Sequence, residues 1–186
     1  MGAGKSTSAG MFAVGHATVV NADVEAKALM AGDKRVRRQL EDTFGAGIIE
    51  ENALSFKALG RIVFSARDHL LQLNAIVHSP LLLRLGKLID ACEDGYCILD
   101  AALAPLWRIE KWFDACLWIE APRDLRFERL RRTVPDLGDK EIAQRMRLQE
   151  ETVSTPTSDV WTVISNDGTL EQLRERCYAA AEALSD

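Results

Sequence analysis

The chain opens with Met1-Gly2-Ala3-Gly4-Lys5-Ser6-Thr7, and most of its architecture can be argued from these residues. They match the second half of the phosphate-binding loop G-x-x-x-x-G-K-[ST], which joins a β-strand to an α-helix. Glycine lets such a loop approach phosphate oxygens, and the amides of the following helix point at the anion. We expect Lys5 to reach the β- and γ-phosphates of a nucleotide and the Ser6 hydroxyl to bind Mg²⁺.

The front half of the motif is missing. Its first glycine would fall before Met1, and no strand leads into the loop. In a parallel sheet that strand would be central and covered on both faces, so its loss would remove about three to five buried aliphatic side chains at roughly 1.5–3 kcal/mol each. That deficit is comparable to a total stability of about 5–15 kcal/mol. We therefore expect the natural protein to start roughly ten residues earlier; the alternative is a truncated, inactive chain.

Length and composition indicate one globular domain. The chain has 186 residues, of which 47% are hydrophobic and 27% charged, as in ordinary folded proteins. The net charge of −5 argues against a nucleic-acid binder that works through bulk positive charge. Basic clusters at 34–38 and 123–132 could hold small phosphorylated ligands, although a solvated helix face is the favoured interpretation of the first.

The remaining composition points to a cytoplasmic protein without a membrane segment. No apolar run approaches the roughly 18 residues of a membrane span. Cys92, Cys97, Cys116 and Cys177 have no metal-ligand spacing, and no signal peptide is apparent. We interpret these cysteines as reduced and mostly buried. Nothing in the sequence indicates the oligomeric state.

Short apolar stretches alternate with amphipathic ones along the chain. The pattern predicts strands at 17–20, 96–99, 116–120 and 160–164, and helices at 5–14, 33–44, 55–65, 80–92, 123–132, 139–152 and 169–184. This alternation is typical of an α/β fold, a parallel sheet flanked by helices. Residues 1–186 are expected to form a single domain, with a helical substrate-side insertion at about 33–92 and a lid at about 123–152.

Two aspartates follow predicted strands, where ligands bind in open α/β sheets. Asp23 could accept a proton from an attacking hydroxyl, or it could cap the next helix, which is the better interpretation from the residues alone. Asp100 could be a Walker-B-like acid that contacts Mg²⁺ or its water. A cap or turn role for Asp100 is about equally plausible.

The lid region is rich in arginine, and phosphoryl transfer needs positive charge against the γ-phosphate. The candidates are Arg129, Arg131, Arg132, Arg145 and Arg147. Most of them are expected to pair with nearby acids, leaving one or two with a functional role. His78 follows an apolar stretch, where a lone histidine is more often a packed structural residue than a catalyst.

Taken together, these segments resemble the dephospho-CoA kinase family over nearly the whole chain. The most specific part is the middle, Phe44-Gly45, then Leu59-Gly60-Arg61-Ile62-Val63-Phe64-Ser65, then Leu73-Asn74-Ala75-Ile76-Val77-His78. The loop, Val19-Val20-Asn21-Ala22-Asp23, Ile98-Leu99-Asp100, Arg145 with Gln149, and Ile164 with Asn166 are similar to further family motifs.

The resemblance implies a kinase with the P-loop nucleoside-triphosphate hydrolase fold. Such an enzyme transfers the ATP γ-phosphate, with Mg²⁺, to the ribose 3′-hydroxyl of dephospho-CoA in the last step of coenzyme A synthesis. The implied site residues are Asp23 as general base; Lys5, Arg132 and Arg145 as catalytic cations; Gly2, Ala3, Gly4, Lys5, Ser6 and Thr7 for the nucleotide; His78 and Asp100 for the substrate; and Ser6 for the metal.

The chain departs from the family pattern at several positions. Asn21 stands where the family usually has an aspartate, and Ser79 replaces a proline. Residues 102–105 do not reproduce the family's "P-L-L-F-E" motif. The glutamate of that motif has no clear match in this chain, and Glu110 is at best a distant substitute. Two alternatives therefore stay open: a P-loop kinase for another small molecule, such as a nucleotide or nucleoside, and an inactive relic of the family.

Overall fold

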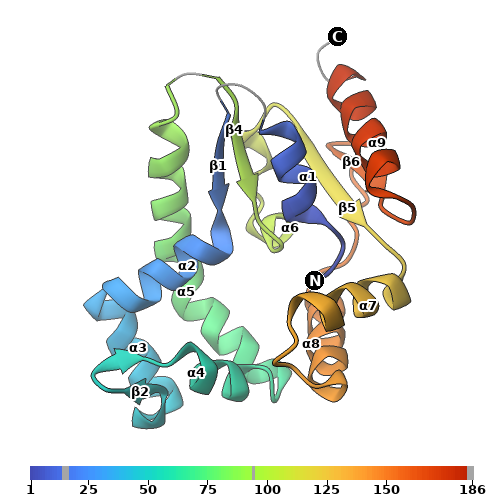
Figure 1. Ribbon diagram of the computed structural model, residues 1–186. Helices are drawn as coiled ribbons and strands as arrows, with labels where there is room; N and C mark the ends of the chain where they lie inside the picture. The colour runs from blue at the N-terminus through green and yellow to red at the C-terminus, as the bar shows by residue number, and fades with distance from the viewer. Residues whose placement is uncertain (14–16, 94, 184–186) are drawn as a thin grey trace. The chain divides into compact units, whose positions relative to one another are not determined.

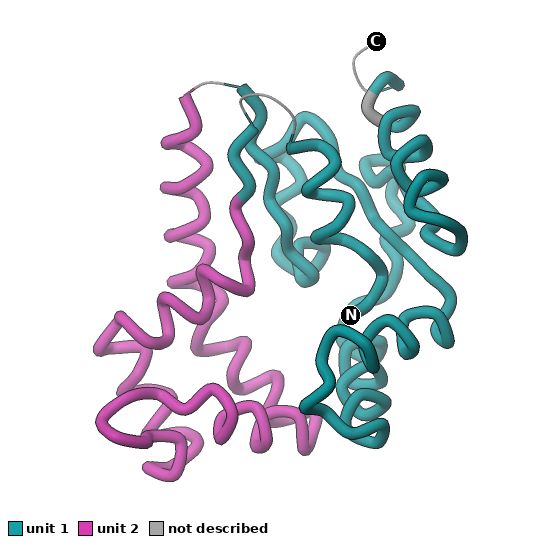
Figure 2. Tube along the Cα trace, in the orientation of Figure 1, with its two compact units in different colours: residues 1–19, 94–186 teal, residues 20–93 magenta. Residues whose placement is uncertain are grey.

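The computed structural model describes residues 1–13, 17–93 and 95–183. The helices predicted for 5–14 and 169–184 therefore each end on a residue outside the described ranges. The chain divides into two compact units, shown in Figure 2: Met1–Val19 with Asp94–Asp186, and Val20–Glu93. Among the described helices, none is long and apolar enough to cross a membrane.

The first unit has the alternating helices and strands that the sequence predicts (Figure 1). Its strands are β4 (Cys97–Asp100), β5 (Cys116–Glu120), β6 (Trp161–Ser165) and the start of β1 (Thr18–Asn21), and its helices are α1 (Lys5–Phe12), α6 (Ala104–Trp107), η2 (Glu110–Trp112), α7 (Arg123–Thr133), α8 (Asp139–Thr152) and α9 (Leu170–Ala183). The predicted strands all exist, each within a residue of its expected bounds. The short helices α6 and η2 were not predicted.

The strands pair in two ladders rather than in one continuous sheet. β5 and β6 are parallel, with Cys116 opposite Trp161 and Glu120 opposite Ser165. β1 pairs with β4, where the Thr18 amide donates to the Tyr96 carbonyl at 2.8 Å. Within the described ranges no ladder joins β4 to β5. The architecture is thus α/β with helices flanking the strands, and the strand expected ahead of the phosphate-binding loop stays a prediction.

The helix that follows the loop packs against β4, β5 and α9. Its apolar residues Met11 and Phe12 contact a buried cluster that β5, β6 and α9 supply. The cluster consists of Ile119, Ile164, Leu173 and Cys177, and Leu173 is only 2% exposed. Burying one such side chain contributes about 1.5–3 kcal/mol. This core anchors the end of α1, the helix that directly follows the loop.

A second core lies between α7 and α8, the pair predicted as the lid. Leu130 from α7 packs on Ile142 and Met146 from α8, and Phe127 and Val134 flank them. Arg126 and Glu150 form an ion pair between the same two helices. The two helices therefore form one rigid pair rather than two separate arms.

The second unit is mostly helical. It contains the end of β1, α2 (Ala22–Gly32), α3 (Lys34–Phe44), η1 (Ala46–Ile48), β2 (Ile49–Glu50), β3 (Ala53–Leu54), α4 (Phe56–Val63) and α5 (Arg67–Asp90). The long helix α5 contacts α2, α3 and α4, and Leu40, Ile48 and Leu85 are completely buried. The helical segment expected at 33–92 lies inside this unit, which also contains the unpredicted helix α2.

The start of α5 differs from the prediction for a physical reason. The sequence pattern predicted a helix beginning at Pro80. The helix instead begins at Arg67 and runs through Pro80. Val77, Leu81 and Leu85 are all buried and recur every fourth residue, so one apolar stripe continues across the proline. Packing of that stripe offsets the backbone hydrogen bond that Pro80 cannot donate.

The N-cap of α2 is Asn21, and this corrects the alternative role suggested for Asp23. The Asn21 side chain accepts hydrogen bonds from the amides of Asp23 and Val24, both at 3.0 Å. Asp23 lies in the first turn of the helix, beyond the cap position. The residue that departs from the family pattern therefore performs the capping, which an uncharged amide does as well as a carboxylate.

Candidate active site

The phosphate-binding loop requires glycine at two positions. Gly2 and Gly4 have φ angles of +70° and +97°, in the region that side chains disfavour. A Cβ atom on Gly2 would lie 2.6 Å from the Arg126 carbonyl oxygen, and one on Gly4 would meet the amide nitrogen of Asn166. Gly4 is the N-cap of α1, and no side chain caps that helix. The first amides of α1 therefore keep the unfilled donors that an anion can use.

Lys5 and Ser6 both bind Asp100. The Lys5 ammonium donates to Oδ1 of Asp100, and the Ser6 hydroxyl donates to Oδ2 at 2.6 Å. Asp100 is the last residue of β4 and is only 3% exposed, while α1 packs against β4. The end of one strand thus supplies a carboxylate directly to the first turn of the helix that follows the loop.

The oxygen donors of this cluster are of the kind that could hold Mg²⁺. Mg²⁺ prefers oxygen ligands and is usually bound by one or two protein groups, with phosphates and waters completing its coordination. The Ser6 hydroxyl and the Asp100 carboxylate are such a pair. Among the described residues, no group of three or more His, Cys, Asp or Glu side chains could hold a metal by itself. The donor set therefore fits a cation that arrives together with phosphate.

Arg129 and Asn166 adjoin the loop, and neither was assigned to the site from the sequence. The Asn166 amide donates to the Ala3 carbonyl at 2.7 Å and accepts from Nη2 of Arg129 at 3.2 Å. Arg129 was one of the arginines considered for the lid, and its place on α7 brings it to the end of β6. In the sequence, Asn166 was noted only as part of a family-like motif with Ile164. That motif does not indicate which residues the Asn166 side chain contacts.

The two lid arginines expected to be catalytic lie in different surroundings. Arg132 is exposed on the last turn of α7. Arg145 is half-buried on α8, and its Nη2 donates to Glu141 at 2.6 Å. The exposed Arg131 and Arg147 pair with acids, as the sequence suggested for most of these residues. Glu110, the distant substitute for the family acid, accepts from the Trp161 indole at 3.4 Å.

Asp23 and His78 belong to the second unit. Asp23 is exposed near the start of α2, and its carboxylate has no hydrogen bond or ion pair with the described residues. His78 is half-buried on α5, and burial lowers the pKa of its imidazole below the ordinary 6.5. The neutral form of His78 is therefore favoured at pH 7.

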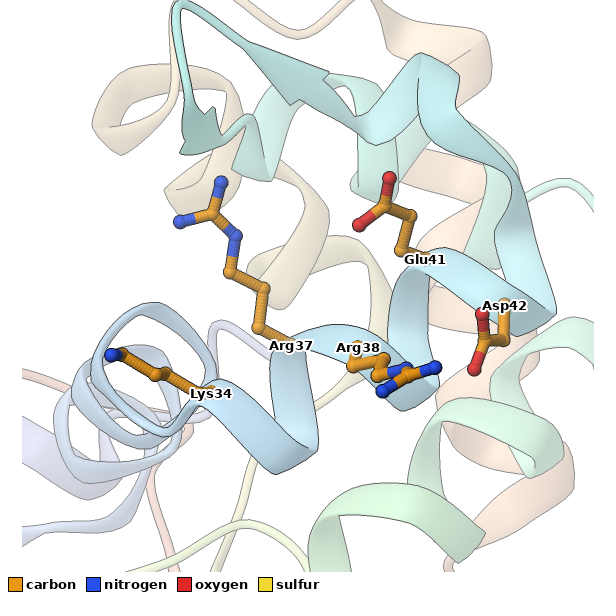
Figure 3. Close-up of a pocket in the computed structure, with 5 residues that line it drawn as sticks. All are labelled: Lys34, Arg37, Arg38, Glu41 and Asp42. Carbon is orange, nitrogen blue, oxygen red and sulfur yellow. The ribbon is translucent and has the colours of Figure 1, made fainter.

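A shallow hollow lies on the surface of α3, at the basic cluster 34–38. Lys34, Arg37 and Arg38 line it together with Glu41 and Asp42, as Figure 3 shows. Arg37 donates to the Asn52 carbonyl of the neighbouring hairpin. The three bases lie toward the start of α3 and the two acids follow them, so the charges partly compensate one another. The favoured interpretation from the sequence, a solvated helix face, stays the better account of the cluster.

The cysteines have no place in the site. Cys116 and Cys177 are buried, and Cys92 and Cys97 are half-buried. Burial raises the pKa of both the Cys116 and the Cys177 thiols. Protonated, buried thiols behave as small apolar side chains rather than as nucleophiles.

Comparisons with known proteins agree with this geometry. A dephospho-CoA kinase from Bacillus licheniformis is 29% identical over 187 residues, covering 98% of this chain and 92% of its own. The crystal structure of TT1252 from Thermus thermophilus superposes with a TM-score of 0.72 at 26% identity, covering 98% and 92% of the two chains. A dephospho-CoA kinase from Campylobacter jejuni shares the fold, with a TM-score of 0.60 at 15% identity and coverage of 100% and 93%.

The family model described as "CoaE: Dephospho-CoA kinase" matches residues 1–172. The match includes the loop, Asp100, both helices of the predicted lid and Asn166. Since it spans nearly the entire chain, the chain belongs to the dephospho-CoA kinase family, whose members are ATP-dependent phosphotransferases.

Proposed function

We propose that this protein transfers the γ-phosphate of ATP to the 3′-hydroxyl of dephospho-CoA. The observation that carries the proposal is the cluster of Lys5, Ser6 and Asp100 at the start of α1. Family membership and the name of the Bacillus licheniformis relative support the choice of acceptor.

On the donor side, the loop amides and Lys5 would bind the β- and γ-phosphates. Ser6 and Asp100 would hold Mg²⁺, which when bound neutralises the negative charge of the phosphate oxygens. Lys5 and Ser6 have Asp100 as their partner before any ligand arrives. Nucleotide binding therefore requires Lys5 to turn from the carboxylate to the phosphates.

On the acceptor side, Asp23 would serve as the general base. Its carboxylate neither caps α2 nor pairs with a described residue, so it has no competing structural task. In the reaction the acceptor oxygen forms a bond to the γ-phosphorus while the bond from that phosphorus to the β,γ-bridging oxygen breaks. The hydroxyl proton passes to Asp23, and ADP leaves.

The test substitutes two acids of the same helix turn. Asp23→Asn should lower turnover by about 10²–10⁴ while leaving ATP binding nearly unchanged. Glu25→Gln removes an equal charge from the first turn of α2, where Glu25 pairs with Arg84 at 2.5 Å, and should keep near-normal turnover. If both variants lose activity equally, the helix charge rather than a base explains the effect, and Asp23 is not the base.

A substrate panel tests the acceptor. Dephospho-CoA should be phosphorylated far faster than AMP, CMP or adenosine. Preferential phosphorylation of one of the others would replace the proposal with a nucleotide or nucleoside kinase. ATP binding without turnover on any acceptor would indicate a relic that keeps the fold and has lost the activity.

A further inference from the structure

Asn166 stands at the meeting point of the loop, α7 and β6, outside the groups that the proposed mechanism employs. The residue is 6% exposed. Its Nδ2 donates to the Ala3 carbonyl at 2.7 Å. Its Oδ1 and its backbone oxygen both accept from Nη2 of Arg129, at 3.2 and 3.1 Å. Its backbone amide donates to the Glu120 carbonyl at the end of β5, at 2.7 Å.

A carboxamide side chain suits this position. The Ala3 carbonyl can only accept a hydrogen bond, and the Arg129 guanidinium can only donate one. The group between them must therefore offer both a donor and an acceptor, and Asn166 supplies them as Nδ2 and Oδ1. This requirement fixes the orientation of the Asn166 amide, and an ionised aspartate could satisfy only the arginine.

The loop rests directly on this amide. A Cβ on Gly4 would meet Nδ2 of Asn166, so the glycine preceding Lys5 packs against the same nitrogen that binds Ala3. The Asn166 backbone amide is hydrogen-bonded to the end of β5. Through Asn166, the position of the loop is therefore fixed relative to the β5–β6 ladder.

One terminal nitrogen of the Arg129 guanidinium is hydrogen-bonded and the other is not. Its Nη2 is bound to Asn166, whereas Nη1 is buried and has no hydrogen-bond partner among the described residues. No described carboxylate pairs with this guanidinium either. A buried donor without a partner costs free energy that an arriving anion can recover. The positive charge beside the loop is therefore available to phosphate.

We propose that Asn166 is a positioning residue that holds the phosphate-binding loop and Arg129 in one fixed arrangement for the nucleotide. The inference rests on the proposed function, because the ligand it serves is the ATP phosphate chain. Asn166 itself touches neither reactant; it acts on the loop through Ala3 and on the charge through Arg129.

The experiment combines Asn166→Ala, the nearly isosteric Asn166→Asp, and Asp167→Ala as the matched control. Asp167 follows in the same loop but is exposed and paired with Arg176. Each variant is assayed for kcat and for KM of ATP, and for binding of a non-hydrolysable ATP analogue with Mg²⁺ by calorimetry. We expect both Asn166 variants to bind the analogue about 10–100-fold more weakly, because one buried hydrogen-bond network is broken. Asp167→Ala should match the wild type.

Arg129→Ala supplies the readout that a purely structural role would not move. Because part of the effect of Asn166 passes through Arg129, Asn166→Ala should weaken analogue binding clearly less in the Arg129→Ala background than in the wild type, and the loss that remains there is the contribution of the Ala3 contact. Full additivity of the two losses would overturn the proposal. So would analogue binding by Asn166→Asp equal to the wild type, since this variant keeps the shape but cannot donate to Ala3.

The binding measurements also separate this inference from the proposed function. A wild-type protein that binds the analogue but does not phosphorylate dephospho-CoA would refute the acceptor assignment alone. The affinities for the ATP analogue would then still test the positioning role of Asn166. A thermal melt of each variant shows that it is folded, and Asn166→Asp serves in place of Asn166→Ala if the alanine variant does not fold.

Discussion

Asp100→Asn should destabilise the protein in the absence of any nucleotide. The substitution keeps the shape of the side chain but replaces an oxygen that accepts from Lys5 or Ser6 with an NH₂ group. Asp100 is 3% exposed, so water cannot repair the lost contact. A hydrogen bond to a charged group is worth about 1.5–3 kcal/mol. The Lys5 side chain is 35% exposed, which screens part of its attraction and favours the lower end of that range.

For a chain of this size, each kcal/mol lowers Tm by about 2–4 °C. We therefore expect Asp100→Asn to melt about 3–6 °C below the wild type at pH 7. Asp167→Asn is the control: its exposed carboxylate pairs with Arg176 at the surface, and its Tm should stay at the wild-type value. The same two variants are then titrated with Mg²⁺ and the ATP analogue. A Tm for Asp100→Asn equal to or above the wild type would refute the reasoning, because it would mean that Lys5 and Ser6 gain nothing from the carboxylate.

Two further predictions concern the second unit. Asn21→Ala should lose about 1 kcal/mol of stability because it removes the cap of α2, whereas Asn21→Asp should retain the stability because aspartate caps equally well; chemical denaturation measures both, and equal losses in the two variants would contradict the capping role. Burial lowers the pKa of His78, so protonation favours the unfolded chain. The stability contributed by neutral His78 is complete above pH 6.5 and is lost as the pH falls below that value. His78→Gln should flatten this part of the curve of unfolding free energy against pH, and an unchanged slope would exclude His78 as its source.

Local patterns predicted β1, β4, β5, β6 and most helices well, because short apolar runs and caps act within a few residues; the two-residue strands β2 and β3 were not predicted. Ser55 and Asp33 cap α4 and α3, and both predicted helices began at these residues. The start of α5 escaped prediction because tertiary packing overrides local preference. The stripe of Val77, Leu81 and Leu85 carries α5 through a proline that was expected to start it.

Some site residues could be predicted from local sequence, and others could not. The loop motif is contiguous, so Gly4, Lys5 and Ser6 were readable from spacing alone, and Asp100 was readable as an acid at a strand end. Asn166 joins the loop from more than 160 positions away, through a single amide that contacts Ala3. No periodicity links residues so distant; they meet because β5 pairs with β6 and α1 packs against β5 and α9. Arg129 was one of several lid arginines, and its contact with Asn166 distinguishes it from the others.

The Lys5 ammonium and the Asp100 carboxylate neutralise each other's charge at the start of α1. If a polyphosphate binds the Lys5 ammonium, the buried Asp100 carboxylate loses its partner. An uncompensated buried charge costs free energy. Anionic ligand and compensating cation are thus expected to enter together, each strengthening the other's hold. A phosphate compound offered alone would have to overcome the ion pair that it disrupts, so we expect metal-free competitors to bind more weakly than the metal complex.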